Sequence, residues 1–280
     1  MKTLFILSIL NIGLSCSNKS KEDIKTIKND KQLIAIVDSI SKVEKSTINL
    51  DSSIVTKNIK QDTIVQEPEQ YEDFIEEAIA KMYKEKDISS IDKKLNELNN
   101  DNKISKTYKT YWKTYLYYYK SLYYKNMLKD DENASKNIDK AILEIETNLK
   151  SSEDYALYAS CLSFSIQFAN MTKLSSISSK VEENAKNSLN LNNKNVRAYY
   201  VLASHNFYTP KMFGGMTKVE EYAIKGISCP NSLADGYYDP YWGKPRLYEL
   251  LIKYYEGEKR IDDANNIKNI AKKEFPNTFK

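Results

Sequence analysis

Few side chains in this chain of 280 residues could carry out nucleophilic, acid–base or metal chemistry. There is one histidine, His205, and there are three cysteines, Cys16, Cys161 and Cys229. Zinc sites of the usual types need several His or Cys ligands at close spacing, and these four residues are scattered along the chain. No GxGxxG, GxxxxGK[ST], HExxH or GxSxG string occurs. The sequence therefore predicts a protein that is not an enzyme and that has no cofactor and no metal.

The charge of the chain argues against nucleic-acid binding. Forty-two Lys and Arg residues against 38 Asp and Glu residues give a net charge of +4, spread without a block of one sign. The arginines, which are suited to bidentate phosphate and guanine contacts, are Arg197, Arg246 and Arg260. The sequence therefore does not indicate a basic surface that would bind nucleic acid.

The N-terminus is typical of an export signal. A short basic start is followed by an apolar stretch over residues 4–14, which is too short to span a bilayer as a helix. The next residues, Leu14-Ser15-Cys16-Ser17, resemble the lipobox of bacterial lipoproteins, in which the cysteine is acylated and becomes the first residue. Gly13 departs from that pattern, because a leucine is preferred three residues before the cysteine. The alternative is an ordinary secretory signal in which Cys16 is incidental.

The lipobox resemblance implies a location. Residues 1–15 would be the signal peptide, and Cys16 would carry the lipid that attaches the chain to a membrane. Ser17 is not the acidic residue that favours retention in the inner membrane, so the resemblance implies an outer-membrane lipoprotein in the cell envelope of a Gram-negative bacterium. Both the periplasmic and the surface-facing side remain open.

Residues 16–70 are predicted to form a flexible linker. Between Ser17 and Gln70 there is no aromatic residue and no glycine, and nine basic residues balance nine acidic ones. Such a segment lacks the bulky apolar groups that offset the entropy of ordering, although one transient amphipathic helix near residues 33–43 is the alternative. A disordered tether of this length has a root-mean-square reach of roughly 40 Å.

The composition changes at Tyr71 and predicts an all-α domain over residues 71–280. No glycine or proline lies between Pro68 and Pro210, and a sheet would need more turn residues than that stretch supplies. Clusters of Asn and Ser then serve as the turns between helices. The predicted helices cover 71–86, 88–99, 105–128, 132–149, 153–170, 173–189, 195–208, 217–228, 244–256 and 260–274.

The spacing of small residues within these helices resembles the tetratricopeptide repeat, a helix-turn-helix unit of 34 residues. Ala264 and Ala271 lie seven apart and are followed by Pro276, which is the family spacing of the second helix and its closing proline; Ala134 and Ala141 repeat the seven-residue step. The resemblance covers most of the domain and implies a right-handed stack of about five antiparallel helix pairs with one concave groove. A generic helical bundle is the alternative.

A tyrosine-rich helix over residues 105–128 supplies the first candidate site. Six aromatic residues share one face at three-four spacing, and this face is expected to be core. They are Tyr108, Tyr111, Trp112, Tyr115, Tyr119 and Tyr123. Tyr117 and Tyr124 lie seven apart on another face and could line the groove, where they would contact a protein or a glycan.

The second candidate is the segment from His205 to Gly215, which breaks a domain otherwise poor in glycine and proline. It contains His205, Tyr208, Pro210, Phe213, Gly214 and Gly215. The Pro-x-x-Phe-Gly-Gly string resembles one in bacterial periplasmic repeat proteins, including helical accessory subunits of solute-uptake systems. One interpretation is a structural turn in which Phe213 plugs the core and a glycine adopts positive φ; the other is a loop that touches a ligand.

The third candidate is the aromatic-rich connection over residues 229–246, which includes Trp242. It is either an adhesive patch or a lid packed over the preceding helix pair. Cys161 and Cys229 lie two repeat lengths apart, too far for a disulfide in a regular stack, so both thiols are expected to be unpaired.

These observations favour a non-enzymatic envelope lipoprotein whose helical groove binds a protein partner, as a scaffold or assembly module. The alternative is a small-ligand receptor or an accessory subunit of a solute-uptake system. The expected partners are an unidentified protein and a membrane reached through the N-terminal lipid; a small ligand is possible and nucleic acid is not expected. A deep pocket with convergent polar groups would favour the receptor.

Overall fold

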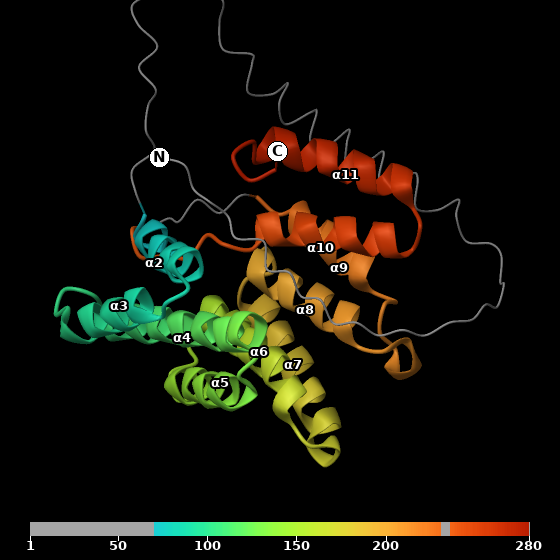
Figure 1. Ribbon diagram of the computed structural model, residues 1–280. Coiled ribbons are helices and arrows are strands. Elements are labelled where there is room, and N and C mark those ends of the chain that lie inside the picture. The colour runs from blue at the N-terminus through green and yellow to red at the C-terminus, as the bar shows by residue number, and fades with distance from the viewer. Residues whose placement is uncertain (1–69, 231–235, 280) are drawn as a thin grey trace, which may run out of the picture. The chain divides into compact units, whose positions relative to one another are not determined.

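The computed structural model describes residues 70–230 and 236–279, and this part of the chain is helical, without a strand (Figure 1). The predicted signal peptide and all of the predicted linker except Gln70 lie outside the described residues. The predicted all-α fold is confirmed, and each predicted helix is present. The helices are α2 (Tyr71–Glu85), α3 (Ser89–Asn100), α4 (Lys106–Tyr123), α5 (Asp131–Glu146), α6 (Ser152–Ser165), α7 (Met171–Leu191), α8 (Val196–Tyr208), α9 (Val219–Ile227), α10 (Lys244–Gly257) and α11 (Ile261–Glu274).

The helices pack as five consecutive pairs, α2 with α3 through to α10 with α11 (Figure 1). The first helix of each pair contacts the first helix of the next pair, so α2, α4, α6, α8 and α10 form one continuous row. The second helices α3, α5, α7 and α9 each also contact the first helix of the following pair. This arrangement is the stack that the sequence predicts.

Small side chains lie where the paired helices approach each other. Ala134 and Ala141 of α5 and Ala264 and Ala271 of α11 are all buried. The Ser121 hydroxyl of α4 donates to the Ala134 carbonyl, which places the backbones of α4 and α5 close together. The seven-residue alanine steps in the sequence therefore mark close helix packing, because only a methyl group fits between the two backbones.

The helix ends follow from local hydrogen bonds to polar side chains. The side chains of Ser105, Ser151 and Asn195 accept from backbone N–H groups in the first turns of α4, α6 and α8. These residues belong to the Asn and Ser clusters in the sequence, which act as turns by capping the helices that follow them. One predicted helix, 105–128, is divided: α4 ends at Tyr123 and a π-helical turn covers Tyr124–Leu128.

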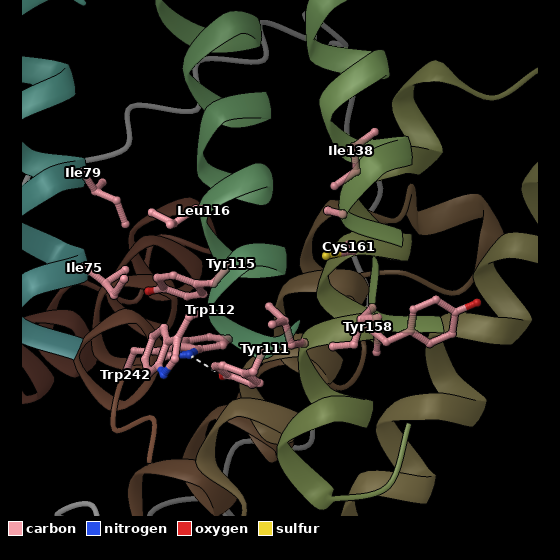
Figure 2. Close-up of a cluster of buried hydrophobic side chains, with 14 of the residues drawn as sticks. Ile75, Ile79, Tyr111, Trp112, Tyr115, Leu116, Ile138, Tyr158, Cys161 and Trp242 are labelled. Carbon is pink, nitrogen blue, oxygen red and sulfur yellow. Dashed lines mark hydrogen bonds between the residues drawn. The ribbon is translucent and has the colours of Figure 1, made fainter. Parts of the chain in front are cut away.

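The predicted aromatic face of α4 forms the centre of a core cluster. Tyr111, Trp112, Tyr115 and Tyr123 are buried, and Figure 2 shows the first three beside Trp242, which comes from the connection before α10. The expected role of this face as core is confirmed. Tyr108 and Tyr119, at its edges, are half-buried.

The connection before α10 also packs on α2. The Glu72 carboxylate accepts hydrogen bonds from the backbone N–H groups of Tyr241 and Trp242, at 2.7 and 3.1 Å. The Tyr71 backbone N–H donates to the Tyr237 carbonyl at 2.9 Å. Trp242 is only 5% exposed, so its side chain is packed and is not part of an adhesive patch; its hydrogen bonds are to α2 and α4 and not only to the helix pair that precedes it.

Candidate functional site

A pocket of about 240 Å³ lies between α7, α8, α9 and the segment that joins α8 to α9. We call it the His205 pocket, because the imidazole side chain of His205 is part of its wall. Its lining residues are Ser178, Glu182, Leu202, His205, Asn206, Thr209, Phe213, Gly214, Thr217, Lys218 and Tyr222. Residues with hydroxyl, imidazole, amide, carboxylate and ammonium side chains therefore line one concavity.

The imidazole of His205 lies between two serine hydroxyls from neighbouring helices. Nε2 is 2.8 Å from the Ser178 hydroxyl oxygen of α7, and Nδ1 is 3.3 Å from that of Ser163 in α6. Burial lowers the pKa of His205, and the nearby Glu182 opposes that shift. The ring is therefore neutral at pH 7 and offers one donor and one acceptor.

This arrangement differs from a serine hydrolase triad in one respect that matters for catalysis. The second nitrogen of a catalytic histidine is held by a carboxylate, which orients the ring and stabilises the imidazolium that forms. In this chain the Ser163 hydroxyl takes that place. Each ring nitrogen of His205 therefore faces a serine hydroxyl.

Asn206 fixes the segment that closes the pocket. Its backbone carbonyl accepts from the Met216 N–H at 2.9 Å, and its side-chain oxygen accepts from the Lys218 N–H at 2.8 Å. Its side-chain amide donates to the Gly214 carbonyl at 3.2 Å. Asn206 thus holds the returning backbone at three places, once through its own carbonyl and twice through its side chain.

The glycine pair is required by the backbone path. Gly214 has φ of +86°, in the left-handed region that favours glycine. A Cβ on Gly215 would lie 1.7 Å from the Thr209 carbonyl oxygen, so no side chain fits there. The expectation that a glycine in this pair has positive φ is confirmed.

Phe213 does not plug the core. Its side chain is 71% exposed, and the neighbouring Met212 is 83% exposed. Both residues belong to the 3-10 turn Lys211–Phe213, which ends at the positive-φ residue Gly214, and Phe213 also lines the pocket. Tyr208 and Pro210 are exposed as well. The interpretation of the loop as a core plug is wrong.

Three of the residues singled out in the sequence lie elsewhere. Tyr117 is half-buried with the Lys140 ammonium 6.0 Å from its ring centre, and Tyr124 is half-buried in the π-helical turn after α4. Trp242 lies in the core. The structure therefore brings His205, Phe213 and Gly214 into one site and leaves Tyr117, Tyr124 and Trp242 outside it.

The pocket also contains residues that the sequence did not single out. Ser178 and Glu182 lie one turn apart on α7, and Tyr222 comes from α9. Polar residues one turn apart are typical of any exposed helix face, so this spacing carries no specific signal. Only the packing of α7 and α9 against α8 reveals that they belong to the site.

The described part of the chain is an all-α stack of helix pairs with a polar pocket between α7, α8, α9 and the segment that joins α8 to α9. No protein-family model matches the chain, and no curated protein matches it significantly. Among solved structures, the chain resembles the HusA haemophore from Porphyromonas gingivalis, with 20% sequence identity and a TM-score of 0.48. The match covers 67% of this chain and 94% of that chain. Similarity at this level does not define a family.

Within residues 70–230 and 236–279, His, Cys, Asp and Glu side chains do not gather into a group that could hold a metal ion. Among the described helices, none combines the length and the apolar character needed to cross a membrane.

Proposed function

We propose that this chain is a small-ligand receptor of the cell envelope, which holds a polar molecule of amino-acid size in the His205 pocket. The observation that carries this proposal is the convergence of donor and acceptor groups from α7, α8 and the 209–218 loop on one concavity. Binding sites combine an apolar wall with a few placed polar groups, and Leu202 and Tyr222 supply such a wall.

The volume and charges of the pocket favour a small zwitterion. Pockets for drug-sized ligands measure about 300–1,000 Å³, and 240 Å³ is below that range. Lys218 makes no ion pair with any described residue, so its ammonium is available to a carboxylate. Glu182, which pairs with the exposed Lys186 at 3.1 Å, can share its second oxygen with a ligand ammonium.

A separate observation supports a second candidate function, contact with a partner protein. Met212 and Phe213 are the most exposed apolar residues of the loop, and Tyr208, at the end of α8, is also exposed. Exposed apolar side chains grouped at the rim of a pocket are typical of interaction surfaces. A receptor that passes its ligand to an uptake system would need such a surface next to its ligand.

The envelope location rests on the lipobox-like sequence around Cys16. Several acyl chains hold a protein stably on a membrane, because each buried methylene contributes about 0.8 kcal/mol. Cys16→Ser is therefore expected to move the protein from the membrane fraction to the soluble fraction. A variant that still fractionates with membranes would contradict the anchor at Cys16.

The ligand proposal is tested by thermal shift and calorimetry with the 20 free amino acids as probes. We expect at least one to raise the melting temperature of the full chain and Ser178→Ala or Lys218→Ala to weaken its binding about tenfold. Lys225→Ala on α9, outside the pocket and paired with Glu221, is the matched control. Binding that these pocket variants leave unchanged, or no binding at millimolar concentration, would contradict the proposal.

A further inference from the structure

The connections from the first to the second helix of each pair lie along one edge of the described stack. At each step of the stack, a contact joins the C-terminal ends of two successive first helices or the connections that follow them. In chain order, these contacts are Tyr83 with Tyr123, Lys125 with Phe168, Ser163 with His205, and Lys211 with Glu258. We call this edge the turn edge and define it as residues 83–89, 123–131, 165–173, 208–219 and 257–261.

Large apolar side chains are exposed along the turn edge. Of the ten such side chains that are exposed in the described part of the chain, seven belong to it: Met127, Leu128, Met171, Tyr208, Met212, Phe213 and Ile261. At the opposite edge, within the described residues, only Leu191 and Tyr237 are of this kind. Single exposed apolar residues are normal, but a concentration of them at one edge marks an interaction surface.

The charge that the turn edge offers to a partner is positive. Four of its exposed lysines form no ion pair with a described residue: Lys86, Lys129, Lys173 and Lys259. Its acidic side chains, in contrast, are each bonded within the chain: Glu85 to Lys81, Asp87 to Ser89, Asp130 to Asn133, Asp131 to Lys125 and Glu258 to Lys211. The free ammonium groups therefore suit an anionic partner.

Three of these lysines have a backbone conformation that glycine usually adopts at the end of a helix. The φ angle is +56° at Lys86, +57° at Lys129 and +62° at Lys259. A side chain in this region has a steric cost that glycine avoids. A cation is favoured near a helix C-terminus, but a lysine anywhere in the last turn meets that preference. These turns therefore present an ammonium group at their tips in spite of the steric cost.

We propose that the turn edge docks on the surface of an anionic phospholipid membrane. In this arrangement the Met, Leu, Ile and Phe side chains enter the boundary between headgroups and acyl chains, and the lysine ammonium groups lie at the headgroup phosphates. Apolar side chains next to lysines are the combination that binds protein surfaces to such membranes. Lysine suits this boundary because its aliphatic stem lies along apolar groups while its ammonium stays in water.

The distribution of the apolar side chains favours a membrane over a partner protein. They come from four separate connections, and Met171 and Met212 are 87% and 83% exposed. A protein interface is a closely packed patch of matched shape. A fluid bilayer accepts separate side chains without a matching shape, and of these seven side chains only Phe213 lines the His205 pocket. In this proposal Met212 and Phe213 belong to the membrane surface, and the test below separates it from the partner-protein contact.

The test mixes the full chain carrying Cys16→Ser with vesicles of phosphatidylcholine, with or without phosphatidylglycerol, and measures bound protein by sedimentation. No acyl chain can contribute, so the result does not depend on the anchor assigned to Cys16. The apolar stretch over residues 4–14 is common to all variants, so differences between them report on the turn edge. We expect tighter binding to the vesicles that contain phosphatidylglycerol.

The lysine variant combines Lys129→Gln, Lys173→Gln and Lys259→Gln. Its binding to the anionic vesicles should weaken by about fivefold for each lysine removed, because each ammonium near an anionic surface adds to the attraction. The matched control removes the same charge at the opposite edge and combines Lys103→Gln, Lys150→Gln and Lys194→Gln. The control should bind like the unsubstituted edge.

The apolar variant combines Leu128→Ser, Met171→Ser and Met212→Ser, and none of these residues lines the His205 pocket. It should bind the anionic vesicles at least about tenfold more weakly, because less apolar surface enters the bilayer. Leu143→Ser with Leu191→Ser is the matched control, since both residues are exposed outside the turn edge. All the changed side chains are exposed, so the melting temperatures should stay unchanged.

Three results would overturn this assignment. The first is that the chain binds neither type of vesicle, which would leave Met212 and Phe213 to the partner-protein contact. The second is equal binding to both types of vesicle, which would remove the requirement for an anionic lipid. The third is that the lysine and apolar variants bind as tightly as their controls, which would place the membrane contact elsewhere in the chain.

Discussion

The indole Nε1 of Trp242 donates a hydrogen bond of 2.9 Å to the hydroxyl of Tyr111, which joins the connection before α10 to α4 across 131 residues (Figure 2). The indole of Trp112 donates in the same way to the Tyr238 carbonyl at 3.0 Å. These bonds, together with the two that Glu72 accepts, tie the first two helix pairs to the segment that leads into the last pair. Neighbour-to-neighbour packing is therefore reinforced by contacts between distant pairs, unlike a simple repeat stack.

Tyr111→Phe is expected to lower the free energy of unfolding by about 1–3 kcal/mol, because it leaves the buried indole N–H of Trp242 without its acceptor. Chemical denaturation measures the change. Tyr124→Phe is the control, since the Tyr124 hydroxyl has no hydrogen bond within the described residues. Equal stability of the two variants would show that the Trp242 bond contributes nothing.

Glu72 makes the stability of the domain depend on pH. Burial raises the pKa of Glu72 from 4.5 to about 8, and the nearby Glu76 acts in the same direction. The folded state therefore binds more protons than the unfolded state between about pH 4.5 and 8, so stability falls as the pH rises through that window. The slope reaches about 1.3 kcal/mol per pH unit at most.

Glu72→Gln is expected to remove this dependence, since the amide oxygen can still accept from the Tyr241 and Trp242 N–H groups without carrying a charge. Urea titrations between pH 5 and pH 8 measure the slope. Glu77→Gln, at an exposed position on the same helix, should keep the wild-type slope. If wild type and Glu72→Gln respond identically to pH, the buried carboxyl is not the source.

The two glycines of the 209–218 loop are expected to respond differently to substitution. Gly214→Ala places a side chain in open space at positive φ and should cost about 1–2 kcal/mol. Gly215→Ala should cost more, because the new Cβ meets the Thr209 carbonyl oxygen, which belongs to the backbone and has to move. Gly257→Ala, with no atom within 4 Å, should leave stability unchanged or raise it slightly. Equal losses at Gly214 and Gly215 would argue against the Thr209 contact.

The helices could be predicted from the sequence because their signals are local. The absence of glycine and proline over residues 69–209, the capping Ser and Asn residues and the alanine steps each depend on a few neighbouring positions. The adjacent glycines likewise predicted an unusual backbone conformation, because glycine adopts positive φ without steric cost.

The site was harder to predict because its geometry is not local. Phe213 is apolar and follows a proline, which suggested a core plug, but its side chain is exposed in the 3-10 turn that ends at Gly214. For Trp242 the sequence left a surface patch and a packed lid equally open, because its hydrogen-bond partner lies on α4, 131 residues away. Ser178 joins the pocket only through the packing of α7 on α8. A pattern within a few neighbouring residues cannot predict contacts between segments that lie this far apart in the sequence.

The ion pair between Arg197 and Glu153 supplies the last prediction. Arg197 of α8 is 3% exposed, its Nε and Nη2 donate to the two oxygens of the Glu153 carboxylate of α6, and its Nη1 donates to the Trp242 carbonyl at 3.0 Å. Arg197→Met should lower the free energy of unfolding by about 3–5 kcal/mol, because it leaves the Glu153 carboxylate without a charged partner and with only the Asn195 amide to donate to it.

The double variant Arg197→Met with Glu153→Leu should recover part of that loss, since no unpaired charge remains at the site. The stability lost in Arg197→Met should be nearly the same at low and at high salt, because buried ion pairs are screened much less than exposed ones. The exposed pair Lys186–Glu182 is the control: Lys186→Met should cost less than about 1 kcal/mol. A double variant no more stable than Arg197→Met alone would mean that the loss comes from the bond to Trp242, and that Glu153 has little part in holding α6 against α8.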